Sequence, residues 1–152
     1  MLFSDIRNIK NAGIAFNIPP NGRGISLYNN TGSIIALGDV ILLEYEETAD
    51  QEICAIIPVT TAFVRKFAVC IIEAVAIGAI GFFQTEGKVK AFCEGSSSIA
   101  KGDSLKLANS ENEFKKDGSA RAATSVAVAL EAYSVATNAL KSVWLIGEGA
   151  TI

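Results

Sequence analysis

The 152-residue chain contains no histidine. Histidine is the usual proton carrier near neutral pH, the partner of serine and cysteine nucleophiles, and a common metal ligand. Its absence excludes Ser-His and Cys-His catalysis and any imidazole metal site. Carboxylates and lysines remain as acid-base groups, but the sequence brings none of them together. We therefore expect a protein without enzymatic activity.

Charged residues are also scarce, at 19% of the chain, and their net charge is −3. Proteins that bind nucleic acid cluster Lys and Arg to neutralise phosphates. No basic run is present here, so we expect no nucleic-acid partner. The densest charge, over residues 44–52, is acidic and is interpreted as a solvated strand end and turn.

Cysteine is limited to Cys54, Cys70 and Cys93, which form no close pair. Disulfide frameworks and zinc sites need paired, closely spaced cysteines. Each of the three lies in an apolar stretch. We predict buried free thiols, no bound metal and no cofactor.

Long apolar runs are missing as well. Charged Asp5, Arg7 and Lys10 interrupt the N-terminus, which therefore does not resemble a secretory signal. The apolar stretch 67–83 is short for a membrane helix and contains Glu73. We expect a protein made in the cytoplasm, with no membrane partner.

What the chain does have is hydrophobic residues, which make up half of it and give a mean hydropathy of +0.36. From Gly24 onward, short β-type runs alternate with turn residues at a spacing typical of sandwiches and barrels. We predict an all-β fold, a single β-sandwich or barrel-like domain over residues 24–152. The surplus apolar surface suggests subunit contacts. The expected strands span residues 24–28, 33–36, 40–46, 53–59, 63–75, 79–83, 89–94, 104–108, 126–131 and 142–146, with turns at 85–87 and 116–118.

Two strands show a clear alternation of side chains. Val89, Ala91 and Cys93 share one face of the strand 89–94. Trp144, the only tryptophan, is expected on the opposite face from its neighbours in the closing strand. A second layer of core or a subunit interface suits it better than a ligand platform.

One segment occurs twice in related form, 64 residues apart. Residues 35–43 read Ile-Ala-Leu-Gly-Asp-Val-Ile-Leu-Leu, and residues 99–107 read Ile-Ala-Lys-Gly-Asp-Ser-Leu-Lys-Leu. In both, a Gly-Asp turn precedes an alternating strand, because Gly permits positive φ and Asp can bond a nearby amide. Two interpretations remain open: similar turns that arose independently, or a duplicated half of the protein.

Ser98 and Lys101 have the Ser-x-x-Lys spacing of serine-lysine acyl enzymes, in which a helical turn brings the two side chains together. Here serines and a Gly-Asp pair surround the motif, and its companion motifs are missing. We interpret the segment as a turn.

Residues 1–23 mix polar residues with single hydrophobes and show no sustained period. Pro19 and Pro20 favour extended backbone and withhold hydrogen-bond donors. We predict an extended N-terminal arm, residues 1–23, ahead of the β-domain.

The order of segments in the C-terminal two thirds forms a further pattern. It comprises a strand after Gly87, a turn and strand at 100–105, a hairpin through 116–118, the strand 127–132 and a final strand at 143–146. This order resembles that of the small decoration, or cement, proteins of tailed-phage heads. Those proteins carry a Gly-x-Ala-Leu-Glu-Ala-like strand near the end, and residues 127–132 match it without the glycine.

The resemblance, over roughly residues 24–147, implies a structural protein of a bacteriophage virion. Decoration proteins bind the outer capsid surface, commonly as trimers, and have no enzymatic activity. The implied partner is the major capsid protein, the implied oligomer a homotrimer, and the implied location the capsid surface after synthesis in the host cytoplasm. Hydrophobes of the arm would insert into shell grooves or add a strand to a shell sheet. These residues are Leu2, Phe3, Ile6, Ile9, Ile14, Phe16 and Ile18.

Other functions fit the same pattern. A phage tail-tube or tail-completion subunit also uses small β-domains with arms. A cellular barrel-sandwich carrier domain, of the lipoyl or biotinyl type, presents a modified lysine at a hairpin tip, where Lys115 and Lys116 are the candidates. An enzyme that uses carboxylates alone is the last alternative.

Overall fold

The computed structural model describes residues 22–44, 54–56, 67–108, 110–118 and 125–146, and these residues form strands and turns without a helix. The all-β prediction is confirmed. Residues 1–21 of the expected arm, with all its candidate shell-binding hydrophobes, lie outside the described residues, and Arg23 begins the first strand. The strands are β1 (Arg23–Asn29), β2 (Val40–Glu44), β3 (Cys54–Ile56), β4 (Phe67–Cys70), β5 (Ile80–Glu94), β6 (Ser104–Leu107), β7 (Phe114–Lys116), β8 (Ala127–Ala129) and β9 (Asn138–Leu145).

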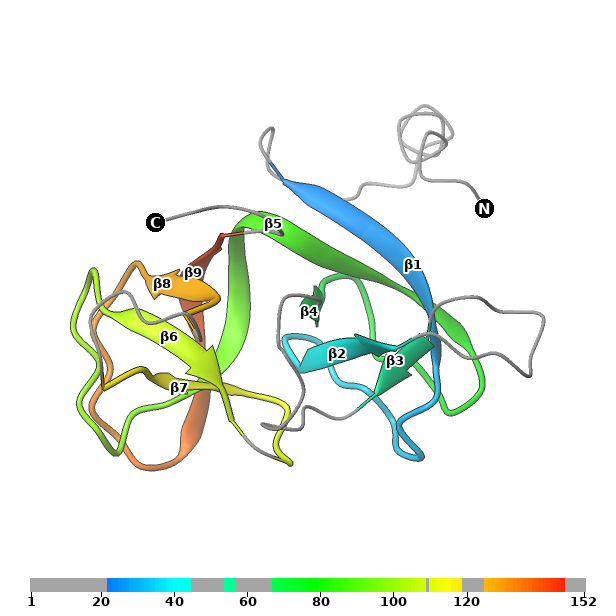
Figure 1. The fold of residues 1–152 in the computed structure, drawn as a ribbon. Coiled ribbons are helices and arrows are strands. Elements are labelled where there is room, and N and C mark those ends of the chain that lie inside the picture. The colour runs from blue at the N-terminus through cyan, green and yellow to red at the C-terminus, as the bar shows by residue number, and fades with distance from the viewer. Residues whose placement is uncertain (1–21, 45–53, 57–66, 109, 119–124, 147–152) are drawn as a thin grey trace.

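The strands close into two barrels that share β5 (Figure 1). In barrel 1 the order is β1-β3-β2-β4-β5, and β5 pairs back with β1. In barrel 2 the order is β5-β7-β6-β8-β9, and β9 pairs back with β5. The first half of β5 belongs to barrel 1 and the second half to barrel 2. The barrel form of the predicted fold is therefore the correct one.

The two barrels have the same strand pairing, position for position. Each contains one parallel pair, β1–β3 in barrel 1 and β5–β7 in barrel 2, and the remaining pairs are antiparallel. Each also contains one isolated bridge between loops, Ile35 with Val75 and Ile99 with Tyr133. The repeated sequence segment thus marks a duplicated structural unit.

Strand β5 runs unbroken through residues 85–87, so the turn expected there is wrong. Gly87 has φ of +91°, a conformation open to glycine, and it marks the point where the strand leaves barrel 1 for barrel 2. The buried Gln84 spans this point, since its amide group donates to the carbonyls of Glu86 and Lys88 at 2.8 and 3.0 Å. The glycine bends a strand and does not end it.

Two expected strands are shorter than predicted. Of residues 33–36, only Ile35 pairs, through its isolated bridge. Of residues 63–75, the described part contains β4 and the bridge at Val75. Ile35 and Val75 are nevertheless buried in the core of barrel 1, so these two positions are apolar because of packing and not because of a long strand ladder.

Alternating side chains divide the core into two clusters. Ile41 of β2 points into barrel 1, whereas its neighbours Val40 and Leu42 point outward and join the core of barrel 2. The outward apolar residues of barrel 1 therefore bind the two barrels together. The barrel 1 cluster consists of Leu27, Ile35, Ile41, Ala68, Cys70, Val75 and Phe83. The larger cluster consists of Val40, Leu42, Phe67, Val69, Ala91, Cys93, Ile99, Leu105, Leu107, Phe114, Val126, Ala127, Ala129, Val143 and Leu145.

Candidate assembly surfaces

The Ser98 and Lys101 motif lies in a turn, as predicted. Ser98 is exposed with φ of +50°, and Lys101 is exposed at the next bend. Lys116 reaches across from β7 and donates from Nζ to the Ser98 carbonyl at 3.2 Å. The motif lacks the helical turn that serine-lysine enzymes use.

The buried thiols belong to the core. Cys70 and Cys93 are free and buried, and burial raises the pKa of each thiol to about 12. A thiol with such a pKa is protonated at neutral pH and is a poor nucleophile or metal ligand. The prediction of buried free thiols is confirmed for these two, while the side chain of Cys54 lies outside the described residues. The described segments contain no group of three or more Cys, Asp or Glu residues that could hold a metal ion.

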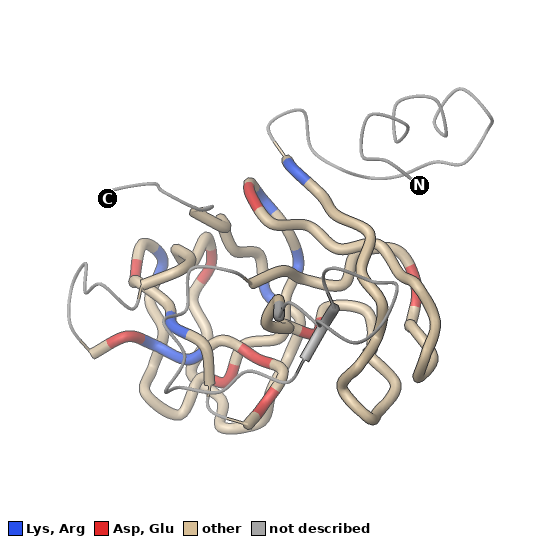
Figure 2. The backbone as a smooth tube through the Cα atoms, turned by 45° about the vertical axis from the view of Figure 1, so that its right-hand side comes forward, with Lys and Arg blue, Asp and Glu red and all other residues tan. Residues whose placement is uncertain are grey.

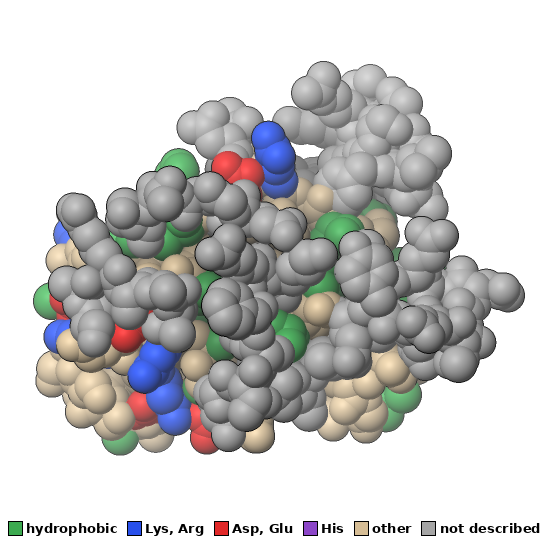
Figure 3. Space-filling model, in the orientation of Figure 1, with side chains coloured by type: hydrophobic (Ala, Val, Ile, Leu, Met, Phe, Trp, Pro, Cys, Tyr) green, Lys and Arg blue, Asp and Glu red, His purple; other side chains and the backbone are tan. Residues whose placement is uncertain are grey.

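The two lysines considered as carrier sites lie within β7 and are engaged in ion pairs. Lys115 Nζ is 2.7 Å from Glu111, and Lys116 Nζ is 2.8 Å from Asp103. Basic and acidic side chains accordingly lie next to one another over barrel 2 (Figure 3). Neither lysine projects freely from a hairpin tip, which disfavours the carrier-domain alternative.

The two Gly-Asp turns have the same internal hydrogen bonds. Oδ2 of Asp39 accepts from the Ala36 amide at 2.7 Å, and Oδ2 of Asp103 accepts from the Ala100 amide at the same distance. Gly38 has φ of +91°, and Gly102 has φ of +93°. The local sequence therefore specifies the same turn twice, as predicted.

The surroundings of the two aspartates differ. Asp39 is half-buried between the barrels, and burial raises the pKa of its carboxyl despite the bonds from Ala36 and Asn112. Asp103 is partly exposed, and its bonds from Lys116 and the Ala100 amide lower its pKa. The first turn is thus a packed element, whereas the second meets solvent.

Several large apolar side chains of the described residues are exposed. Trp144 is 40% exposed between buried Val143 and Leu145, which confirms the predicted alternation. Contiguous exposed apolar patches mark protein–protein contacts, whereas single exposed hydrophobes are ordinary on a protein surface. The exposed side chains are Ile34, Leu37, Ile77, Ile80, Val135, Leu140 and Trp144.

Apart from Trp144, nothing in the sequence indicated which of these side chains would be exposed. Ile80 was expected only as part of the strand 79–83, and Leu140 lies outside the strands predicted from the sequence. The one signal available was the repeated segment, because equivalent positions of a duplicated unit can be compared directly. No helix in the described part of the chain has the length and apolar character needed to cross a membrane.

Comparison with protein-family models gives no match. Comparison with curated proteins gives none either. Among solved structures, the fold occurs in a component of a phage head. That structure is the N base of head fiber gp8.5 in bacteriophage phi29, with a TM-score of 0.55 and 13% sequence identity. The alignment covers 82% of this chain and 93% of the phi29 chain, so the likeness extends over both barrels and shows a common fold.

Proposed function

We propose that this chain is a structural protein of a bacteriophage virion, which binds the outer surface of the capsid as a decoration protein. The observation that carries the proposal is the shared fold with the phi29 head fiber base over most of both chains. Its partner would be the major capsid protein, and its location the capsid surface after synthesis in the host cytoplasm. No catalysis is required of it.

The described residues suit such a role. The two barrels share a strand and a core cluster, which makes a rigid block suited to bridging shell subunits. Several weak contacts made at once by a trimer would give high avidity without a tight single site. The arm would add the anchoring contacts, through the hydrophobes between Leu2 and Ile18.

The base of a longer head fiber is the second candidate, because the matched structure is itself a fiber base. Both candidates place the chain on the head, but they differ in abundance. Quantitative mass spectrometry of purified particles of the phage that encodes the chain would separate them. Copy numbers near parity with the shell protein support decoration, and much lower numbers on heads without tails support a fiber base. Enrichment in isolated tails, or absence from particles, would overturn the head assignment.

The arm is tested separately. Deletion of residues 1–22 is expected to leave a folded β-domain that binds purified shells much more weakly. Replacing the seven arm hydrophobes by serine at constant length should have the same effect, since it removes their apolar contacts alone. Replacing Asn8 and Asn11 by serine is the matched control. Unchanged binding after the deletion would exclude the anchor.

A further inference from the structure

Three isoleucines of barrel 1 are the most exposed large hydrophobes among the described residues. The exposed fraction is 64% for Ile34, 61% for Ile77 and 64% for Ile80. Ile34 lies in the loop that follows β1, Ile77 lies in the loop that leads into β5, and Ile80 is the first residue of β5. Apolar surface of this kind is stabilised by burial against a partner if its members are contiguous.

The buried Asn29 holds the two loops together. Its side-chain amide donates to the Ser33 carbonyl at 2.7 Å and to the Val75 carbonyl at 2.9 Å. Ser33 immediately precedes Ile34, and Val75 lies two residues before Ile77. One buried side chain therefore fixes two of the exposed isoleucines close to one another.

Tyr28 connects the third isoleucine to this site. It pairs with Ile80 across β1 and β5, which places both side chains on the same face of the sheet. A Cβ added to Gly78, the residue after Ile77, would lie 3.3 Å from the Tyr28 hydroxyl oxygen. The pairing of Tyr28 with Cys54 is made by the backbone at the other edge of β1, and Ile80 remains exposed beside it. The isoleucine patch consists of Tyr28, Ile34, Ile77 and Ile80.

The isoleucine patch lies in two segments, 24–38 and 74–85, that contain no charged residue. The common strand register and the two bridges place their counterparts in barrel 2 at residues 88–102 and 132–145. The charged residues of these counterparts are Lys88, Lys90, Glu94, Lys101 and Lys141. The duplicated fold thus accepts charge at this surface, yet the patch in barrel 1 has none, and most charged residues of the described chain lie on barrel 2 (Figure 2).

The lack of charge favours a second copy of the chain as the partner. When a surface meets its own copy at a symmetry axis, the same residues approach one another from both sides. Each charge would then face a like charge, which is unfavourable. A contact with a different protein has no such constraint, because opposite charges on the two partners can attract one another. Contacts between identical chains are accordingly more apolar than other interfaces.

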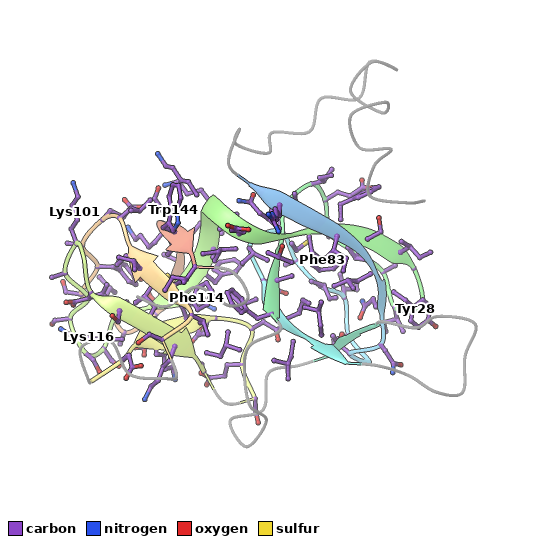
Figure 4. All side chains as sticks on the ribbon, turned by 45° about the horizontal axis from the view of Figure 1, so that its top comes forward. Tyr28, Phe83, Lys101, Phe114, Lys116 and Trp144 are labelled. Carbon is purple, nitrogen blue, oxygen red and sulfur yellow. The ribbon has the colours of Figure 1, made fainter. Side chains whose placement is uncertain are left out.

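We propose that copies of this chain associate through the isoleucine patch, which meets the same patch of another copy at a symmetry axis. Lys101 and Tyr28 lie at opposite ends of the molecule (Figure 4), so barrel 2 points away from the axis and its charges stay in solvent. The patch is small, and the association is therefore reversible and depends on concentration. Because the patch carries no charge, added salt does not weaken the contact. This self-association goes beyond binding to a capsid and does not depend on it.

Two charge variants of the isolated full-length chain test whether the patch faces itself. Ile77→Glu and Ile77→Lys each place a charge at an exposed loop position, where folding should be unaffected. Size-exclusion chromatography with light scattering should show an oligomer for the wild type and a monomer for each variant, because like charges meet at the axis. An equimolar mixture of the two variants should recover an oligomer that contains both chains, since opposite charges then face each other.

Val135→Glu and Val135→Lys are the matched controls. Val135 is 53% exposed and lies two residues after Tyr133, just as Ile77 lies two residues after Val75 in the equivalent bridge. Both controls should retain the wild-type oligomer. A wild type that is monomeric at every concentration, or an unchanged oligomer in Ile77→Glu, would overturn the proposal. A mixture that stays monomeric would overturn it too, and would indicate that the patch meets a different surface of its neighbour.

Chemical crosslinking covers the case in which a charged variant fails to fold. Ile77→Cys in a Cys54→Ser background introduces one accessible thiol, because Cys70 and Cys93 are buried. A short bis-maleimide should link two copies at position 77 and double the mass on a denaturing gel, whereas Val135→Cys in the same background should remain a single chain. Equal linking at both positions, or none at position 77, would contradict the contact. No capsid is present in these experiments, so failure here leaves the capsid-binding proposal untouched, and failure of capsid binding leaves this contact untouched.

Discussion

The ring of Phe67 in β4 meets the ring of Phe114 in β7 edge-on, with centroids 6.0 Å apart and planes at 82°. Phe67 belongs to barrel 1 and Phe114 to barrel 2, and both are buried. An edge-to-face pair adds about 0.5–1.5 kcal/mol beyond the burial of its area. The two barrels therefore share apolar packing as well as a strand, and we expect them to unfold together.

Removing this packing should destabilise both barrels. Phe67→Ala is expected to lower the free energy of unfolding by about 3–5 kcal/mol, because it removes a buried ring and leaves a cavity. The substitution lies in barrel 1, whereas the fluorescence of Trp144 reports on the unfolding of barrel 2. In urea, fluorescence and far-UV circular dichroism should give coincident transitions, both shifted. Ile34→Ala, at an exposed site, is the control, and separate transitions would show that the barrels unfold independently.

The two turn aspartates should have opposite effects on stability as the pH changes. The pKa of Asp103 is lowered in the folded state, so its stabilisation is present above the unfolded value of 3.8 and is lost as the pH falls. The pKa of Asp39 is raised by burial. Its contribution to the stability of the folded state therefore declines as the pH rises above the unfolded value of 3.8.

Urea titrations of Asp103→Asn and Asp39→Asn between acidic and neutral pH would measure this. The loss in free energy of unfolding caused by Asp103→Asn should grow with pH to about 0.5–1 kcal/mol, the usual size for a partly exposed ion pair. The penalty of Asp39→Asn should shrink over the same range. Parallel trends for the two variants would contradict the difference in environment between the turns.

Gly87 should resist substitution more than an unstrained glycine. An L-residue at its φ of +91° is strained, and we expect Gly87→Ala to cost about 1–2 kcal/mol of folding free energy. Gly118→Ala provides the comparison, because no described atom lies within 4 Å of its Cβ and it has no positive φ. Thermal unfolding of both variants would measure the difference, and equal stability would argue against a required bend at Gly87.

The buried thiols should be inert in the folded protein. A Cys54→Ser variant retains Cys70 and Cys93, whose pKa of about 12 and burial keep both protonated and inaccessible. An aromatic disulfide reagent at pH 8 should titrate no thiol in the native variant and both thiols in denaturant. Rapid reaction of the native variant would mean that one of the barrels opens readily.

The sequence predicted those features that depend on neighbouring residues. The alternation at Val89, Ala91 and Cys93 and the exposure of Trp144 follow from the period of two in a strand. The Gly-Asp turns follow from local turn chemistry. The strand order could not be predicted in the same way, because strand pairing in a barrel depends on contacts between residues that are distant in sequence.

Other features could not be predicted because their local sequence is compatible with more than one structure. Thr85-Glu86-Gly87 reads as a hairpin turn, yet the strand continues and uses the glycine to change barrels. The segments around Gly38 and Gly102 are similar in sequence, and only the fold shows that one is packed and the other open. The candidate arm residues lie outside the described residues, so their role stays a prediction.

The shared strand also sets an order of events during translation. Every strand of barrel 1 has left the ribosome once residue 86 has emerged, whereas barrel 2 must wait for β9 to end at Leu145. Domains form from the N-terminus during synthesis. In the interval, barrel 1 would present the outward faces of Val40, Leu42 and Phe67 to solvent, because the packing that covers them has not yet been made. The nascent chain is therefore most prone to aggregation, and most in need of a chaperone, between the closure of its first barrel and that of its second.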